Sequence, residues 1–342
     1  MTKAPDTNGP ATKAPAIPVA LVEPTTLLGR DVRAVLTERA FPASKVNLFH
    51  QTGGPGGLLA AEDDEVAFIA PLAADALETS RIAFLCGSAE ETARFLKTRV
   101  DGALAIDLSG VRNGQPLVVP SEDGDPKPLP AGNLFLTPHP VAFVLAEVVR
   151  TVNAAVPVAG VTAAVDRPVS ELGKAALDEL FEQALALATF RPMPKKILGT
   201  QVAFNSHAPA DSRAFEARVA DDTAALLAAD IPITILSARA GVFHGHLIRV
   251  ELRLSADAPP GLVDRFRERK HAFEIVDPEN LSGPVESAGR DETLLLRFEA
   301  EGRRVTLTLA ADHLRRAGAI LAVRLAEQAA RERGWLDPPT DA

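Results

Sequence analysis

The first third of the chain alternates short apolar runs with helix-like segments, and this order limits the possible folds more than any other feature. After the first run, Val32, Val35 and Leu36 recur at the spacing of an amphipathic helix. Strands that alternate with helices predict a parallel, doubly wound α/β sheet, which here forms a Rossmann-like, nucleotide-binding-type domain. The strand-like runs are PVALV (18–22), KVNLF (45–49), EVAFIA (65–70), RIAFLC (81–86) and GALAIDLSG (102–110).

The pattern changes near residue 135. PVAFVLAEVVRTV (140–152) is apolar on nearly all sides, as expected of an internal helix, and a second helix is predicted over 174–190. That helix has one apolar face, made of Leu177, Leu180, Phe181, Ala184 and Leu185. Strict alternation over 248–254 and a hairpin turn at Gly302 predict a mostly antiparallel sheet with one solvated face. We therefore expect an α+β dimerisation domain after the Rossmann-like one.

We expect four parts along the chain. Residues 1–16 form a disordered tail rich in Pro, Ala, Thr and Lys. Residues 17–135 form the Rossmann-like domain, which the C-terminal helix at 313–335 completes. Residues 136–312 form the dimerisation domain, so the protein is expected to be a dimer.

The net charge of −9 and the lack of a basic stripe argue against nucleic acid as a partner. No apolar run reaches the roughly 18 residues of a membrane span, and the N-terminal segment has no signal-peptide core. The expectation is a cytoplasmic protein without a membrane partner.

Cysteine and histidine give little support for a metal site. Cys86 is the single cysteine and lies in an apolar run, as a small buried side chain would. His244 and His246 have a His-x-His spacing, but no carboxylates cluster near them in sequence. We therefore predict no bound metal.

Six segments in this order resemble the aspartate-semialdehyde dehydrogenase family, and most closely its Usg-type branch. The resemblance runs from about Val19 to Glu327. The segments are LLGRDVRAVLTERAFP, AIDLSG, PVSELGKAALDEL, QVAFN, RAGVFHGH and ADHLRRAGAILAVRLAE.

The resemblance implies NADP-dependent chemistry that starts from a cysteine thiolate at a helix N-terminus. The thiolate attacks an aldehyde, hydride passes to the cofactor, and phosphate releases an acyl phosphate. In this chain the segment TPHPVA takes the place of the family's NPNCST-like segment, with Pro140 at the position of the cysteine. Proline offers neither a nucleophile nor a backbone N–H, so the family's covalent route is closed at this position. A substitute role for Cys86 would need a different geometry.

The resemblance also assigns other site positions. His246 lies seven residues after Arg239, the spacing of the family's base and its carboxylate-binding arginine. Arg167 replaces the family's substrate-orienting glutamine. Glu216 and Arg218 match, more loosely, a family pair near the substrate. Without the thiol we interpret Arg239 and His246 as vestigial, with ordinary structural roles, and working catalysis is the alternative.

The cofactor side departs from the family in the same way. The family's GATGAVG turn becomes EPTTLLG (23–29), in which only Gly29 remains; Thr25 and Gly29 are the degenerate cofactor positions. Glu23 adds a negative charge and a Cβ where a diphosphate must approach. The resemblance places the family's arginine that holds the 2′-phosphate of the cofactor near Gly53. It places the family's asparagine on the nicotinamide side, in the last helix, at Leu321. We therefore expect no bound cofactor.

These changes favour a catalytically degenerate homologue that serves as a dimeric scaffold or binds a partner or ligand. One alternative is an enzyme of altered chemistry that uses Arg167, Arg239 and His246 on an anionic substrate. The other is an active NADP-dependent aspartate-semialdehyde dehydrogenase. The partner is expected to be a second copy of the chain, with a heterodimer with an active paralogue also open.

Overall fold

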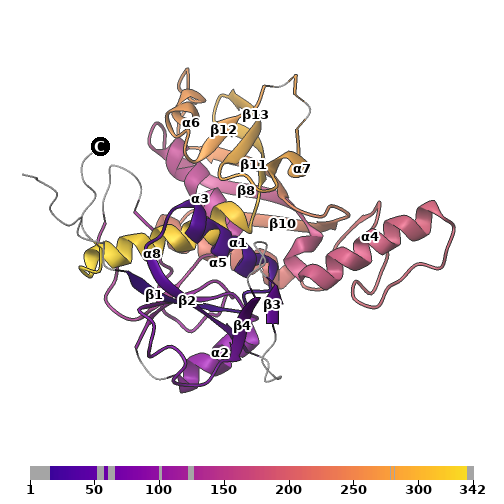
Figure 1. Cartoon of the computed structure of the whole chain (residues 1–342). Helices are drawn as coiled ribbons and strands as arrows, with labels where there is room; N and C mark the ends of the chain where they lie inside the picture. The colour runs from indigo at the N-terminus through magenta and orange to yellow at the C-terminus, as the bar shows by residue number, and fades with distance from the viewer. Residues whose placement is uncertain are drawn as a thin grey trace, which may run out of the picture.

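Two seven-stranded sheets make up the framework of the protein (Figure 1). The computed structural model describes residues 16–51, 58–60, 66–99, 102–121, 127–277, 279–280 and 282–336. The expected tail at 1–16, apart from its last residue, and the glycine-rich loop with Gly53 lie outside the described residues.

The first sheet has the order β3-β4-β2-β1-β5-β6-β7. All its pairs are parallel except β3 with β4, so the predicted parallel α/β sheet is confirmed. Strands β5 and β6 are buried along their whole length, as their continuous apolar sequence requires. The elements are β1 (Ile17–Val22), α1 (Leu27–Glu38), β2 (Ala43–His50), β3 (Leu58–Ala60), β4 (Val66–Pro71), β5 (Ile82–Leu85), α2 (Ala89–Thr98), β6 (Leu104–Asp107) and β7 (Leu134–Leu136).

The C-terminal helical segment packs back onto this first sheet. It starts as a π-helical turn, η2 (Arg315–Ile320), and continues as α8 (Leu321–Glu332). Apolar residues of both, from Ala319 to Ala330, share one core cluster with β1, α1, β5 and β6. The last segment in sequence therefore lies beside the first helix in space (Figure 1).

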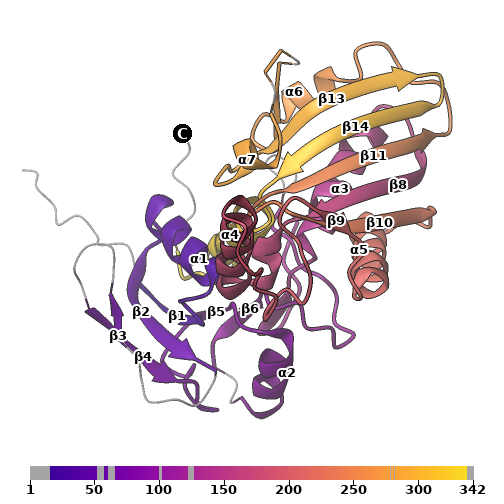
Figure 2. The same cartoon turned by 90° about the vertical axis from the view of Figure 1, so that its right-hand side faces the viewer.

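The second sheet is mixed, with the order β12-β13-β14-β11-β8-β10-β9 and four antiparallel pairs out of six. Helices α3 and α5 pack on one face of it (Figure 2). In β11, Ile248, Val250 and Leu252 are buried while the alternate residues are exposed, as the sequence predicts. The elements are α3 (Pro140–Asn153), β8 (Val158–Arg167), η1 (Val169–Leu172), β9 (Ser206–His207), α5 (Ser212–Leu227), β10 (Ile233–Ala240), β11 (His246–Leu254), α6 (Asp264–Glu268), β12 (Phe273–Ile275), α7 (Pro284–Ser287), β13 (Thr293–Glu301) and β14 (Arg304–Ala311).

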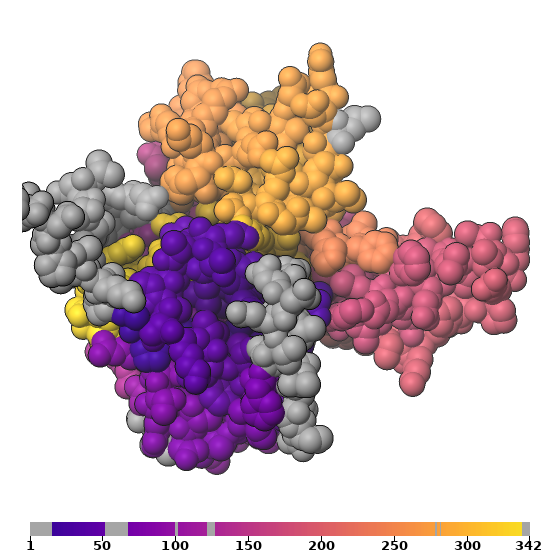
Figure 3. All heavy atoms as spheres, in the orientation of Figure 1, coloured from indigo at the N-terminus to yellow at the C-terminus, as the bar shows by residue number. Residues whose placement is uncertain are grey.

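Helix α4 (Lys174–Ala188) and the loop after it project from the body as an arm (Figures 1 and 3). The predicted helix forms, and its predicted apolar face is buried in part. Leu180 is 1% exposed and Leu177 and Ala184 pack beside it, whereas Phe181 and Leu185 are 61% and 47% exposed. The buried face also includes Glu179, whose carboxylate accepts hydrogen bonds from the backbone N–H groups of the irregular loop at Ile197 and Leu198.

No helix among the described residues is long and apolar enough to cross a membrane.

Candidate functional site

A cavity of about 580 Å³ lies between the two sheets. On one side it is lined by the start of α1, the segment after β5 and the segment after β6, which all follow the carboxyl ends of parallel strands. On the other side it is lined by the start of α3, by η1 and by residues of β8, α5 and β11. This edge of an open α/β sheet is where such folds bind ligands.

Pro140 is the first residue of α3 and lines this cavity. The preceding residue, His139, caps the helix: its Nδ1 accepts a hydrogen bond from the Val141 backbone N–H at 3.2 Å. The backbone N–H of His139 donates a hydrogen bond to the carboxylate of Asp222, in α5, at 2.7 Å. Burial holds the pKa of His139 well below its usual range, and the positive charge of Arg218 lowers it further. The first turn of α3 is therefore held by the neutral imidazole of His139 and by the carboxylate of Asp222, which is 83 positions away in sequence.

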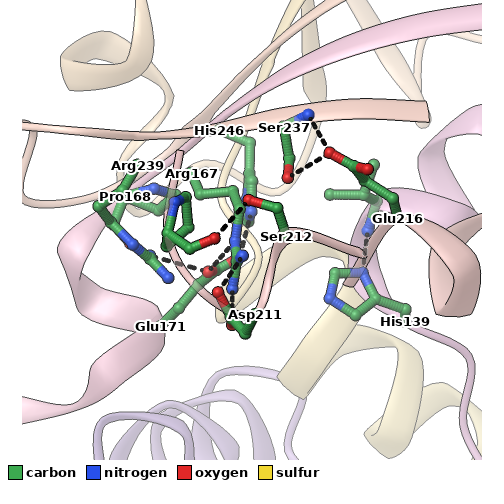
Figure 4. A network of polar contacts seen from close by, with 12 residues as sticks. His139, Arg167, Pro168, Glu171, Asp211, Ser212, Glu216, Ser237, Arg239 and His246 are labelled. Carbon is green, nitrogen blue, oxygen red and sulfur yellow. Dashed lines mark hydrogen bonds and ion pairs between the residues drawn. The ribbon is translucent and has the colours of Figure 1, made fainter. Parts of the chain in front are cut away.

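A cluster of charged side chains from β8, η1, β10 and β11 lies on this same side of the cavity (Figure 4). One oxygen of Glu171 accepts hydrogen bonds from Arg167 Nε at 2.8 Å and Arg239 Nη1 at 2.9 Å. Its other oxygen lies 2.7 Å from His246 Nε2. Arg167 also makes a two-pronged pair with Asp211 at 3.0 and 2.9 Å. The structure thus brings Arg167, Arg239 and His246 together, around a carboxylate that the sequence did not single out.

The charges of this cluster fix its ionisation. Burial raises the pKa of Glu171, but the hydrogen bond and charge of His246, with the charges of Arg167 and Arg239, outweigh it. The pKa of Glu171 therefore lies well below its usual range, and the carboxylate is ionised at neutral pH. Arg239 is further held by the backbone carbonyl of Pro168.

His313 lies against His246, edge to face, with ring centroids 5.1 Å apart. It lines the same cavity, and neither of its ring nitrogens has a hydrogen-bond partner among the described residues. Burial and the positive charge of His246 lower the pKa of His313 to about 4. His313 is therefore neutral near pH 7.

Glu216 and Arg218 do not act as a pair in the cavity. Glu216 accepts hydrogen bonds from the backbone N–H and the hydroxyl of Ser237, away from the arginine cluster (Figure 4). Arg218 lines the cavity, and within the part of the chain that the structure describes its Nε has no hydrogen-bond partner. The nearest carboxylate to that nitrogen, Asp222, is 3.9 Å away and is bound on both oxygens by Arg112. Arg218 thus presents an incompletely satisfied positive charge to the cavity.

Cys86 follows β5 and forms part of the cavity wall, but it is only 5% exposed. Burial, together with the negative charges of Asp107 and Glu23, raises the pKa of its thiol far above the usual range. The thiolate is the reactive form of cysteine, so this thiol is poorly suited to act as a nucleophile.

The turn between β1 and α1 is tied together by its own side chains. Glu23 has a positive φ of 60°, and its carboxylate accepts a hydrogen bond from the Gln51 backbone N–H at 2.6 Å. Thr26, not Thr25, caps α1 by accepting from Gly29 N–H at 3.0 Å. A Cβ on Gly29 would lie 2.3 Å from the Glu23 carbonyl oxygen, so only glycine allows this close approach.

The other proposed cofactor positions do not meet this cavity. Thr25 is exposed and is not among the lining residues. Leu321 is 2% exposed and also does not line it. The side chain of Gln51 packs against Gly87, since a Cβ added to Gly87 would lie 1.8 Å from Gln51 Oε1. Within the described part of the chain, no group of three or more His, Cys, Asp or Glu residues is placed to hold a metal ion.

Sequence reasoning missed Glu171, Asp211, His139 and His313 as residues of this wall. Glu171 lies in the PVSELG segment and follows Arg167 by four residues, a spacing that allows an ion pair. Its contacts with Arg239 and His246 join residues 68 and 75 positions apart. Such pairings depend on the sheet register, in which Arg239 of β10 lies beside Arg167 of β8.

Comparison with known proteins gives a consistent result. No protein-family model matches the chain. An aspartate-semialdehyde dehydrogenase of Rickettsia bellii is 24% identical over 327 residues, covering 91% of this chain and 96% of that protein. A USG-1 protein homolog of Pseudomonas aeruginosa is 26% identical over 324 residues, covering 90% and 96%.

Among solved structures, that of a probable aspartate-semialdehyde dehydrogenase from Pseudomonas aeruginosa matches with a TM-score of 0.82 and 25% identity. It covers 93% of this chain and 99% of that one. Both the order of the elements and the full-length matches agree with the resemblance read from the six sequence segments. Over nearly its whole length the chain is therefore similar to aspartate-semialdehyde dehydrogenases and to USG-1 protein homologs, and its fold matches that of a probable aspartate-semialdehyde dehydrogenase.

Proposed function

We propose that this protein is a non-catalytic member of its family, acting as a dimeric scaffold or binding a partner or ligand. One observation carries the proposal: Pro140 stands at the first position of α3, on the wall of the cavity. The family resemblance places the nucleophilic cysteine here. Proline supplies no thiol, and it has no backbone N–H to hold an oxyanion.

The surroundings of Cys86 support the same proposal. A thiol that replaced the missing one would need a lowered pKa, which positive charges or a helix N-terminus provide. Cys86 has the opposite environment, since it is buried and the nearby charges that act on it, Asp107 and Glu23, are negative.

The turn after β1 supports the loss of cofactor binding. In a dinucleotide site, glycines let the backbone approach the diphosphate. Here Glu23 holds the positive-φ position and binds the backbone after β2, and Gln51 packs against Gly87. A diphosphate at this turn would lie near the carboxylate of Glu23, without the glycines that let the backbone come close.

A second candidate is an enzyme of altered chemistry on an anionic substrate. The contact of 2.7 Å between His246 and Glu171 favours it, because an imidazole oriented by a carboxylate can move a proton. The two arginines that would bind the anion are, however, already paired with Glu171 and Asp211. We therefore rank it second, ahead of an active aspartate-semialdehyde dehydrogenase.

The arm supports a protein partner, and we propose a second copy of this chain. Six large apolar residues between positions 172 and 204 are strongly exposed, and a monomer rarely leaves so many in one region. They are Leu172, Phe181, Leu185, Phe190, Ile197 and Phe204. An active paralogue is the alternative partner for the same surface.

The assay that tests the proposal is phosphate-dependent oxidation of aspartate semialdehyde with NADP, followed as NADPH formation. We expect no turnover above the rate without protein, with an active family member as the positive control. Turnover by the wild-type chain would contradict the proposal. Its loss in Cys86→Ser would then assign the nucleophile to Cys86.

A further inference from the structure

Three cationic or hydrogen-bonding side chains converge on one carboxylate that belongs to the same chain. Arg167 and Arg239 donate to one oxygen of Glu171, and His246 lies at hydrogen-bonding distance from the other. Two guanidinium groups and an imidazole around one carboxylate are the usual composition of a binding site for a small organic acid.

The position of Glu171 is that of a ligand rather than of a surface ion pair. Its side chain is 12% exposed, and the side chains of Arg167 and Arg239 are 5% and 3% exposed. It lines the cavity together with Arg167 and His246, on a short turn, η1, that directly follows β8. Figure 4 shows the carboxylate between the arginines.

Glu171 is the carboxylate that both arginines of the cluster share. Arg167 and Arg239 contribute two positive charges, and Glu171 and Asp211 contribute two negative ones. Asp211 is 53% exposed and pairs with Arg167 alone, so Glu171 is the buried anion for both arginines. Removing it would leave a buried guanidinium without its carboxylate, which is strongly unfavourable.

We propose that Glu171 is an intramolecular occupant of an anion site, and that it keeps external carboxylates away from Arg167, Arg239 and His246. The site takes a carboxylate of a small organic acid once Glu171 is shortened. The inference does not depend on whether the protein is catalytic, since it concerns binding alone.

The experiment compares acetate and succinate with chloride at equal ionic strength, using calorimetry and thermal unfolding of the full chain. Glu171→Ala should bind acetate or succinate saturably, and at least about tenfold more tightly than the wild type, which should respond to all three salts equally. The double variant Glu171→Ala/Arg239→Met should lose this binding.

Glu179→Ala is the matched control, because Glu179 is equally buried but binds backbone N–H groups instead of arginines. It should lose stability without gaining any response to acetate. Wild-type protein that binds acetate as tightly as Glu171→Ala would overturn the inference. So would a folded Glu171→Ala protein that does not distinguish acetate from chloride.

If Glu171→Ala does not fold in chloride, the yield of folded protein is compared after refolding in acetate and in chloride. The inference predicts a higher yield in acetate, because the added anion replaces the missing carboxylate. Equal yields in the two salts would overturn it.

Discussion

Pro140 suits the first turn of a helix, but it carries no thiol at the position where the resemblance places the family's cysteine. The sequence alone predicts a helix start there, since proline suits the first turn, and the structure confirms that start. The capping residue could not be predicted, because His139 is not one of the usual capping types and its backbone is anchored to Asp222, 83 residues away. The start of this helix could therefore be predicted from the sequence, but the contact with Asp222 that holds it could not.

His313 should make the fold sensitive to acid. Its pKa is about 4 in the folded chain and ordinarily 6.5, so between these values the unfolded chain takes up a proton that the folded chain does not. Stability should therefore fall as the pH drops from about 6.5 to about 4, by on the order of 1–3 kcal/mol from this residue.

Urea unfolding of His313→Asn at pH 7 and pH 5 tests this expectation. The variant should lose less stability than the wild type between the two pH values. His271→Asn, which changes an exposed histidine, is the control and should follow the wild type. If His313→Asn kept the full wild-type loss, the assignment to His313 would be wrong.

At the scale of single elements, helices and strands were predicted better than the faces they bury. The alternating residues of β11 were assigned correctly because both faces of that strand have unambiguous chemistry. The buried face of α4 was assigned only in part, since Leu177, Leu180 and Ala184 pack inward while Phe181 and Leu185 do not. That face also includes Glu179 and Gln183, which are buried by hydrogen bonds to the loop that follows. Sequence periodicity cannot show such bonds, because they depend on how an irregular loop folds back.

The exposed side of the arm gives a prediction about assembly. The wild-type chain should elute in gel filtration with light scattering at twice its mass of 36.1 kDa. Phe181→Asp should shift it toward the monomer, because the change places a charge in the proposed contact. Lys174→Glu, at the exposed and paired start of α4, is the control and should remain dimeric. Wild-type protein found only as monomer would contradict the dimer.

For the whole molecule, the types of the two sheets and their sequence along the chain could be predicted, whereas the cavity between the sheets could not. The sheets follow from local periodicity. The cavity depends on which ends of which strands meet, and its central residue, Glu171, contacts partners that only the register of β8, β10 and β11 brings together. The resemblance supplied Arg167, Arg239 and His246, but it assigned them to a substrate and not to an internal carboxylate.

Titration of the purified protein with NADPH, followed by the fluorescence of the cofactor, tests the central claim most directly. By the resemblance, Gly29 alone remains of the glycines of the dinucleotide turn, and the carboxylate of Glu23 in that turn accepts a hydrogen bond from the Gln51 backbone N–H. We therefore predict no saturable signal at micromolar NADPH, while an active family member saturates under the same conditions. Micromolar binding by the wild-type chain would contradict the proposal of a non-catalytic scaffold.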